Sequence, residues 1–240
     1  MPDSDVTITW LGHATTRFDH GDTTILVDPF LKDNPAVPDD MKSASRVDLI
    51  LITHGHYDHF ADAVPIAQQT GAHVICIFEI GQYLRSKGVD NVTDMNKGGT
   101  VHWNGFDVTM VDAIHSSDIV DGDRMVPGGS AAGFVVRFPN GFVAYHAGDT
   151  DVYEGFKLTG QRYNPDVALL PIGGHYTMDP QGAAEAARML GAPSIIPIHY
   201  GTWPPLAGTP DQLKQALGDA GGIKVVALKP GETVKQSDLV

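Results

Sequence analysis

A chain of 240 residues with 42% apolar and 19% charged residues has the composition of a globular protein with one large α/β domain or two small ones. Its net charge of −13 disfavours non-specific binding to DNA or RNA, which depends on Lys and Arg neutralising phosphates. A single cysteine, Cys76, excludes an intrachain disulfide, and no apolar run approaches the roughly 20 residues that span a bilayer.

The N-terminal residues do not have the pattern of a targeting sequence. Residues 1–5 are polar and acidic, and they lack the basic and apolar regions of a signal peptide. We therefore expect a soluble protein of the cytoplasm, with no membrane span and no nucleic-acid partner.

The first third of the chain predicts short strands followed by a helix. Residues 6–11 alternate apolar with polar or small side chains, and residues 16–18 and 24–27 flank a turn, as in a hairpin. Residues 48–53 hold a continuous apolar run, which is typical of a strand buried on both faces. Residues 60–69 predict a helix that Gly71 ends.

The middle third predicts a further strand and helix and then more strands. Residues 73–78 predict a buried strand that contains Cys76, whose expected role is core packing. A short helix over residues 79–87 is expected to end at Gly88. Four strands follow, and Asn140-Gly141 between the last two is a strong hairpin signal. Their ranges are 100–103, 107–113, 133–138 and 142–146.

The last third alternates strand with helix. In chain order we expect a strand at 167–171, a helix at 180–190, a strand at 194–198, a helix at 210–217 and a strand at 223–227. Hairpins and β–α alternation therefore occur in both halves of the chain. This order favours an α/β (α+β) fold of two mixed β-sheets with helices outside, rather than one doubly wound sheet. Because no linker is long enough to separate domains, residues 1–240 are expected to form a single domain.

Metal-binding side chains are concentrated directly after the predicted strand at 48–53. His54, His56, Asp58 and His59 fall within six residues, in the sequence Thr-His-Gly-His-Tyr-Asp-His. Neutral imidazole is a strong ligand for zinc and similar ions, and carboxylate supplies charge and a second ligand type. A Gly-containing loop after a strand would spread these side chains around an ion, so the sequence predicts a metal site here.

Four other polar side chains also follow apolar strands: His115, Asp149, His175 and His199. A lone histidine in such a place is more often a hydrogen-bonded structural residue, and His146 is interpreted in that way. Beside the early cluster, however, converging strand ends provide a rigid base for a metal site. Seven residues then divide into two sets of three and a bridge, which suits two metals that activate one water. The seven are His54, His56, Asp58, His59, His115, Asp149 and His199.

The order His-x-His-x-Asp-His, lone His, lone Asp in Gly-Asp-Thr and lone His resembles the metallo-β-lactamase-fold hydrolase superfamily over nearly the whole chain. Four further motifs resemble a narrower branch, the metal-dependent hydrolases allied to the L-ascorbate-6-phosphate lactonases. These motifs are Trp10-Leu11-Gly12-His13-Ala14, Val27-Asp28-Pro29, His115-Ser116-Ser117 and Leu170-Pro171-Ile172-Gly173-Gly174. The superfamily motif is specific for fold and metal but a poor guide to substrate, because the same site serves lactones, thioesters, phosphodiesters and β-lactams.

The resemblance implies a four-layer αββα sandwich with a dinuclear site along its edge. It assigns the first metal to His54, His56 and His115, the second metal to Asp58, His59 and His199, and the bridge to Asp149, opposite a shared hydroxide. Zinc is the first expectation for nitrogen-rich donors, and Mn²⁺, Fe²⁺ or Ni²⁺ suit the same donors.

Three residues have expected catalytic roles. Asp58 is expected to orient the nucleophile as well as to bind metal, and Asp149 is expected to act as the bridge. His175 is a candidate to contact substrate, to protonate the leaving group, or to replace an expected ligand. The two glycines before His175 permit close approach of the backbone.

Other side chains are candidates to support the site. Asp28 and Thr53 are expected to accept the second ring N–H of ligand histidines, although the position of Asp28 suits a simple turn equally well. His13 either contacts substrate near the metals or packs its own loop. Trp203, in a Gly-Thr-Trp-Pro-Pro loop, is a candidate apolar wall of the pocket.

The segment after His115 has an unusual composition. Residues 117–130 include Asp118, Asp121 and Asp123, and the pair Gly128-Gly129 suggests mobility. This loop either covers the site or forms solvated surface, and solvated surface is the favoured interpretation.

The function that the sequence predicts is that of a metal-dependent hydrolase, in which a metal-bridging hydroxide attacks a small ester, lactone or phosphodiester. One alternative is an iron sulfur dioxygenase on the same fold, which would hold a single iron and consume oxygen. Another is a non-catalytic ligand-binding protein that kept the fold. The expected partner is a small-molecule substrate, and the choice between a monomer and a homo-oligomer stays open.

Overall fold

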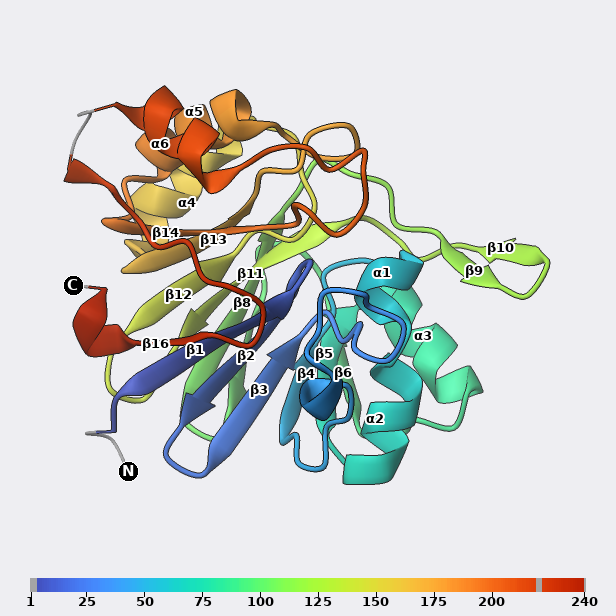
Figure 1. Ribbon diagram of the computed structural model, residues 1–240. Helices are drawn as coiled ribbons and strands as arrows, with labels where there is room; N and C mark the ends of the chain where they lie inside the picture. The colour runs from blue at the N-terminus through green and yellow to red at the C-terminus, as the bar shows by residue number, and fades with distance from the viewer. Residues whose placement is uncertain (1–3, 219–221, 240) are drawn as a thin grey trace.

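The computed structural model describes residues 4–218 and 222–239, in which two seven-stranded β-sheets pack face to face. Three helices from the N-terminal half cover the outer face of one sheet, and three helices from the C-terminal half cover the outer face of the other (Figure 1). This is the four-layer αββα sandwich of two mixed sheets, so the predicted fold class is confirmed.

The first sheet joins the two ends of the chain to a parallel βα unit. Its strands in spatial order are β16 (Thr233–Lys235), β1 (Val6–Gly12), β2 (Thr15–His20), β3 (Thr23–Val27), β4 (Leu49–Leu51), β5 (His73–Ile77) and β6 (Val92–Met95). Pairs from β16 to β3 are antiparallel, and pairs from β3 to β6 are parallel. Its connections contain η1 (Asp39–Met41), α1 (Tyr57–Phe60), α2 (Ala63–Thr70) and α3 (Phe78–Ser86).

The second sheet has a similar plan, with antiparallel strands at one side and parallel strands at the other. Its strands in spatial order are β15 (Lys224–Val225), β14 (Ser194–Ile198), β13 (Val167–Pro171), β12 (Val143–His146), β11 (Ala132–Arg137), β8 (Phe106–Asp112) and β7 (Thr100–Trp103). Pairs from β15 to β12 are parallel. Helices α4 (Gly155–Tyr163), α5 (Pro180–Leu190) and α6 (Pro210–Leu217) connect the parallel strands, and η3 (Gln236–Asp238) follows β16. Within the described ranges, none of these helices is long and apolar enough to cross a membrane.

Two apolar layers hold the sandwich together. The larger one includes Phe18, Phe134 and Phe138 from the facing sides of the two sheets. The smaller one, around Tyr145 and Phe156, lies between the second sheet and its three helices. Burial of apolar surface is the main stabilising term, at roughly 25 cal/mol per Å².

The best-predicted elements have strong start and stop signals. β7, β13, α5, β14 and α6 match their predicted bounds residue for residue. Helix α5 begins with Pro180 after Asp179, whose carboxylate accepts hydrogen bonds from the N–H groups of Gln181 and Gly182. It ends before Gly191, which adopts the left-handed conformation that suits glycine.

The single helix predicted over residues 60–69 is wrong, because the segment forms α1 and α2 with a break between them. The break lies at Asp62, whose carboxylate accepts the backbone N–H groups of Leu31 and Lys32 at 2.6 and 3.0 Å. This contact comes from a distant loop, so no local pattern could have indicated it.

Two other predicted segments also differ. Residues 117–130, predicted as a loop, contain the hairpin β9 (Ile119–Asp121) and β10 (Arg124–Val126), which projects from the body of the molecule (Figure 1). The strand predicted at 223–227 is reduced to the two residues of β15, beside residues 219–221, which lie outside the described ranges.

The edge at which several strands end is the part of the fold that positions the chemistry. Parallel strands end at the same edge of a sheet, so the loops after β3 and β4 are neighbours, as are those after β12, β13 and β14. Four non-glycine residues here adopt left-handed backbone angles: His13, Asp28, His175 and His199, with φ of 56°, 49°, 61° and 55°. Each costs about 1–2 kcal/mol, and such strain tends to cluster at functional sites.

Candidate metal centre

The early histidine cluster lies in the connection from β4 to α1. His54 and His56 belong to the loop that follows β4, whereas Asp58 and His59 belong to the first turn of α1. The other predicted donors come from the opposite sheet: His115 follows β8, Asp149 follows β12 and His199 follows β14. The two sheets thus contribute to one constellation, in which all seven predicted donors come together.

The first donor group consists of His54, His56 and His115, whose ring nitrogens lie within 4.8 Å of one another. Nε2 of His54 and Nδ1 of His56 are 3.0 Å apart. Burial is the largest cause that lowers the pKa of each of these imidazoles below the ordinary value of 6.5. The three rings are therefore neutral near pH 7, which is the form that binds metal ions.

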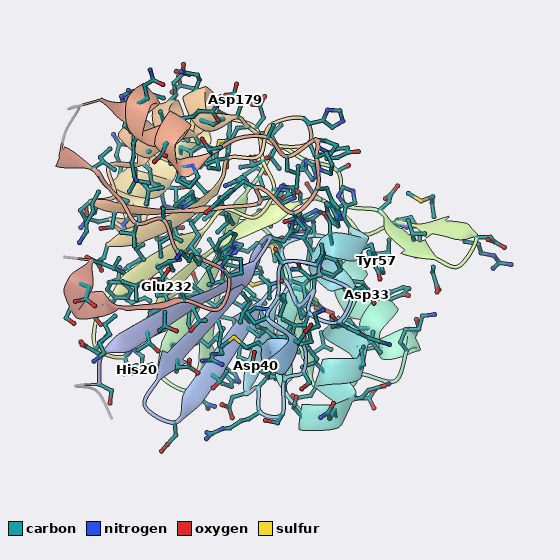
Figure 2. The ribbon with its side chains drawn as sticks, viewed as in Figure 1. His20, Asp33, Asp40, Tyr57, Asp179 and Glu232 are labelled. Carbon is teal, nitrogen blue, oxygen red and sulfur yellow. The ribbon has the colours of Figure 1, made fainter. Side chains whose placement is uncertain are left out.

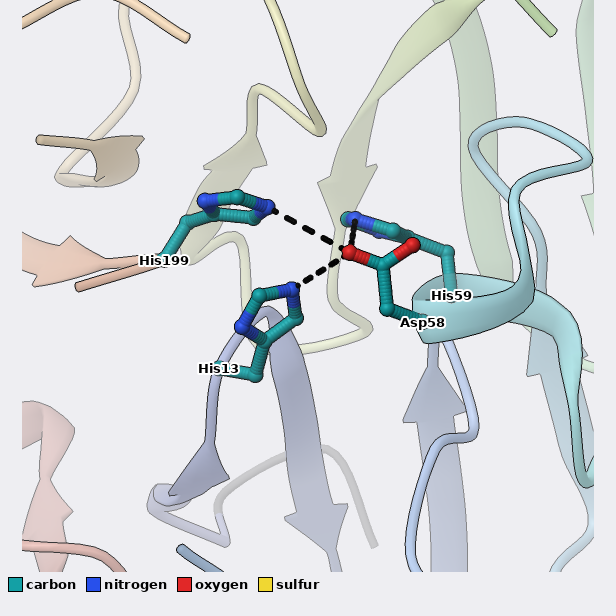
Figure 3. A group of neighbouring side chains, drawn as sticks. All are labelled: His13, Asp58, His59 and His199. Carbon is teal, nitrogen blue, oxygen red and sulfur yellow. Dashed lines mark hydrogen bonds and ion pairs between the residues drawn. The ribbon is translucent and has the colours of Figure 1, made fainter. Parts of the chain in front are cut away.

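The second donor group consists of His13, Asp58, His59 and His199, which Figure 3 shows around the carboxylate of Asp58. Oδ2 of Asp58 lies 2.8 Å from Nε2 of His13, 3.9 Å from Nε2 of His59 and 3.8 Å from Nε2 of His199. This group contains the three residues expected for the second metal and one more imidazole, that of His13.

Asp149 lies between the two groups. Its Oδ2 is 4.0 Å from Nε2 of His54 and 3.6 Å from Nε2 of His115, which belong to the first group. The same oxygen is 3.3 Å from Nε2 of His59 and 3.0 Å from Nε2 of His199, which belong to the second. Burial alone would raise the pKa of Asp149, but His199 and His59 outweigh it and hold that pKa well below its usual range. Asp149 is therefore an anionic carboxylate in contact with both groups.

Among the residues that the structure describes, several buried polar atoms at this site have no hydrogen-bond partner. They are Oδ1 of Asp149, Nε2 of His59 and both ring nitrogens of His199. Leaving such atoms unpaired costs about 1–3 kcal/mol each, and more for a charged group. Converging imidazole nitrogens beside an unpaired carboxylate oxygen are the donor set that divalent transition metals prefer, so the residues present fit metal ions.

Asp28 and Thr53 hold two of the histidines from behind. Oδ2 of Asp28 accepts Nδ1–H of His59 at 2.8 Å and the hydroxyl of Thr53 at 2.7 Å. Oγ1 of Thr53 in turn lies 3.0 Å from Nδ1 of His54, and its backbone N–H donates to Oδ1 of Asp28. The Nδ1 atoms of His59 and His54 are therefore hydrogen-bonded, and their Nε2 atoms are directed at the other donors. This is the role that the sequence predicted for Asp28 and Thr53, acceptance of the second ring N–H of these histidines.

His13 is fully buried and makes four hydrogen bonds that tie parts of the site together. Its Nε2 contacts Asp58, and its Nδ1 lies 2.9 Å from Oγ1 of Thr202. Its carbonyl oxygen accepts the backbone N–H of His199 and the indole N–H of Trp10, both at 2.8 Å. Burial, followed by His199, lowers the pKa of His13 to about 4, so the ring is neutral. The sequence left two roles open for His13, contact with substrate or packing of its loop. The structure shows the packing role, and the partner of the ring is Asp58, a predicted metal donor.

His175 and His146 lie in different surroundings. His175 is exposed on the loop after β13, and its ring packs edge-on against Tyr176 with centroids 4.4 Å apart. It belongs to neither donor group. His146 is buried, donates to the carbonyl of Ala14 at 3.0 Å and accepts the N–H of Gly148 at 3.2 Å. It fixes the loop that carries Asp149, in agreement with the structural role predicted for it.

Two serines that sequence reasoning did not assign also support the site. Oγ of Ser116 lies 3.2 Å from Nε2 of His56. Oγ of Ser117 accepts the N–H of Gly55 and donates to the carbonyl of Gly128, so it connects the metal-binding loop to the base of the β9–β10 hairpin. The motif His115-Ser116-Ser117 was the only signal in the sequence for these contacts.

Comparisons with known proteins identify the family of this chain. Residues 23–200 match the family described as "Beta-lactamase superfamily domain". A "UPF0173 metal-dependent hydrolase" of Rubrobacter xylanophilus is 49% identical over 228 residues, covering 94% of both chains. One from Koribacter versatilis is 49% identical over 227 residues, covering 94% of this chain and 96% of its own.

A solved structure shows the same relationship. A metallo hydrolase of the hyperthermophilic archaeon Ignicoccus hospitalis has a TM-score of 0.85 and 36% identity, covering 97% of this chain and 98% of the other. The chain therefore belongs to the metal-dependent hydrolases of the β-lactamase superfamily.

Proposed function

We propose that this metal-dependent hydrolase is dinuclear and acts on a small ester, lactone or phosphodiester. The observation that supports this most is the position of Asp149, whose Oδ2 lies within 4.0 Å of imidazole nitrogens in both donor groups. Its second oxygen, Oδ1, is buried and has no hydrogen-bond partner within the described part of the chain. A carboxylate shared by two donor groups is what a bridged pair of ions requires.

Each ion has its own protein donors in this proposal. The first would be held by His54, His56 and His115, the second by Asp58, His59 and His199, and Asp149 would contact both. Zinc is the first expectation, and Mn²⁺, Fe²⁺ or Ni²⁺ suit the same donors. When bound, two such ions supply a hydroxide nucleophile at neutral pH and stabilise negative charge in the transition state.

The side chains themselves have distinct tasks. Those of His54, His59 and His199 are at most 1% exposed, whereas Asp58 is 24% and His115 is 14% exposed. Substrate therefore approaches from the side of Asp58 and His115. Asp58, fixed through Oδ2 by His13, acts there to orient the nucleophile.

His13 acts as a positioning residue, because it reaches the reaction only through Asp58 and His199. His175 keeps its predicted role as a group that protonates the leaving group or contacts substrate. Two observations support that role. His175 is exposed in the loop after β13. The same loop packs closely on His199, because a Cβ on Gly173 would lie 2.2 Å from the carbonyl oxygen of His199.

The two alternatives find less support. A single-iron dioxygenase would use one donor group and leave the other group without a purpose. A non-catalytic protein would have no need for unpaired buried donors such as those of Asp149 and His199, which cost stability.

The test is metal analysis of protein purified without added metal, paired with a screen of chromogenic lactones, thioesters and phosphodiesters. We expect two ions per chain and turnover of at least one substrate class. Asp149→Asn should abolish turnover and lower the metal content. Asp151→Asn, which changes an exposed carboxylate two residues away, should do neither. One iron per chain with oxygen consumption, or full activity in Asp149→Asn, would overturn the proposal.

A further inference from the structure

Most of the large apolar side chains that remain exposed lie in segments that follow strands ending at the edge of the metal centre. In the described parts of the chain they are Tyr57, Phe78, Ile114, Val120, Met125, Leu158, Tyr176 and Trp203. All except Leu158 lie in segments that directly follow strands β4, β5, β8, β13 and β14, or in the hairpin after β8. These strands end at the edge that contains the donor groups, so these exposed apolar side chains belong to the same edge of the sandwich as the donors.

Three aromatic rings form a continuous row that begins at the second donor group. Trp203 packs against His13 with ring centroids 4.9 Å apart, Phe30 lies 6.1 Å from Trp203, and Tyr57 lies 5.7 Å from Phe30. We call Trp203, Phe30 and Tyr57 the aromatic wall. Phe30, in the middle of the row, is buried, whereas Trp203 and Tyr57 are 36% and 54% exposed. The wall therefore offers two accessible rings. Trp203 packs directly on His13, which holds Asp58, and only Phe30 separates Tyr57 from His13.

The exposed rings of the wall are anchored. The hydroxyl of Tyr57 donates to Oδ2 of Asp33 at 2.7 Å, and both residues appear side by side at the rim in Figure 2. The loop of Trp203 is closed by hydrogen bonds between Leu206 and its neighbours Trp203 and Gly201. A surface that is held in place loses little conformational entropy when a ligand binds, which favours binding.

The charge around the site points in the same direction. Among the described residues, no Lys or Arg forms a hydrogen bond or ion pair with Asp149 or with any of the seven members of the two donor groups. The chain as a whole has a net charge of −13. The donor groups themselves therefore hold no Lys or Arg that would pair with a second anionic group of a substrate.

We propose that the aromatic wall binds a neutral apolar group, aryl or alkyl, attached next to the scissile bond. The inference rests on the proposed function and narrows its substrate class to esters or diesters that carry an apolar substituent. Trp203 is the principal contact, because it is both exposed and in contact with His13.

The experiment measures binding of two hydroxamic acids to the metal-loaded full-length chain by calorimetry. Acetohydroxamate and benzohydroxamate chelate a divalent metal through the same atoms and differ only in the apolar group. We expect benzohydroxamate to bind about tenfold more tightly, from burial and stacking of its ring. Trp203→Ala should reduce benzohydroxamate to the affinity of acetohydroxamate, and Trp203→Phe should restore most of the preference. Leu158→Ala, which removes an exposed apolar side chain on α4, should leave the preference intact.

Each outcome decides between the proposals. Equal affinities in the wild type, or an unchanged preference in Trp203→Ala, would overturn the assignment of the wall while leaving the metal site in place. Failure of both hydroxamates to bind would overturn the assignment of the wall, and metal analysis of the same sample would show whether the dinuclear centre fails with it. Co-sedimentation of the protein with phosphatidylcholine vesicles, combined with equal hydroxamate affinities, would assign the apolar rim to a lipid surface instead.

Discussion

His13 and Asp58, 45 positions apart in the chain, form a hydrogen bond of 2.8 Å at the inner side of the metal centre. The bond connects the loop after β1 to the first turn of α1. Because the neutral ring of His13 has one N–H, its Nε2 donates to the carboxylate and its Nδ1 accepts from the hydroxyl of Thr202. Asp58 is thereby held in one orientation before any metal ion binds.

His13→Ala should weaken the binding of the second metal ion more than the binding of the first. Groups that orient metal ligands typically contribute 10- to 100-fold in metal affinity, and we expect a loss in roughly that range for one of two ions. The measurement is a metal titration of the demetallated protein followed by calorimetry. His13→Gln, whose amide is able to donate to Asp58, should recover part of the affinity.

The matched control for His13→Ala is His102→Ala. His102 is also hydrogen-bonded to an aspartate, Asp107, but it is exposed on β7, away from the centre. This variant should bind both ions as the wild type does. Two equally affected ions in His13→Ala would show that the residue acts on the fold as a whole.

The sequence was sufficient to predict which side chains come together because each of them follows a strand. His54, Asp149 and His199 each follow an apolar strand, and each of these strands pairs in parallel with at least one neighbour in its sheet. In such an arrangement, sequence position after a strand translates into a place at one edge. Two mixed sheets could be inferred for the same reason, since hairpins and β–α units each have a local pattern.

What the sequence could not show depends on contacts between distant segments. The partner of His13 is 45 residues away, and β16 pairs with β1 from the other end of the chain. Helix α4 was missed because its two glycines and short length hide any apolar period. The position of Asp28 requires a left-handed backbone, which an Asp-Pro pair does not indicate.

Asp28→Asn should damage both stability and metal binding. The buried carboxylate accepts three hydrogen bonds, from the ring of His59 and from the hydroxyl and N–H of Thr53. An amide in its place would present an N–H to a donor and leave buried groups unpaired, at a cost of about 1–3 kcal/mol. Urea unfolding of the demetallated chain measures that cost. Asp40→Asn, an exposed carboxylate, is the control, and equal stability of the two variants would contradict the role of Asp28.

Gly128→Ala should destabilise the connection between the hairpin and the metal-binding loop. A Cβ at this position would lie 1.7 Å from the carbonyl oxygen of Ser117, which is backbone and cannot move aside cheaply. We expect a loss of about 1–3 kcal/mol in the free energy of unfolding, as for overpacked interiors. Gly122→Ala at the tip of the hairpin meets no atom within 4 Å and should cost only about 1 kcal/mol, from its positive φ. A smaller loss in Gly128→Ala than in Gly122→Ala would show that the two segments are not rigidly joined.

Cys76 should make the stability of the protein depend on pH above neutrality. The thiol is fully buried in β5, and burial raises its pKa far above the ordinary value of 9.0. The native thiol therefore keeps its proton where the thiol of the unfolded chain loses it, so the free energy of unfolding is unaffected below pH 9 and falls above it. Between pH 7.5 and 9.5 the expected decrease is roughly 0.8 kcal/mol, which Cys76→Ala should lack. Urea unfolding of both proteins at the two pH values measures it. An equal decrease in the two proteins, or rapid labelling of the native thiol by a disulfide reagent at pH 9, would show that Cys76 is accessible to solvent.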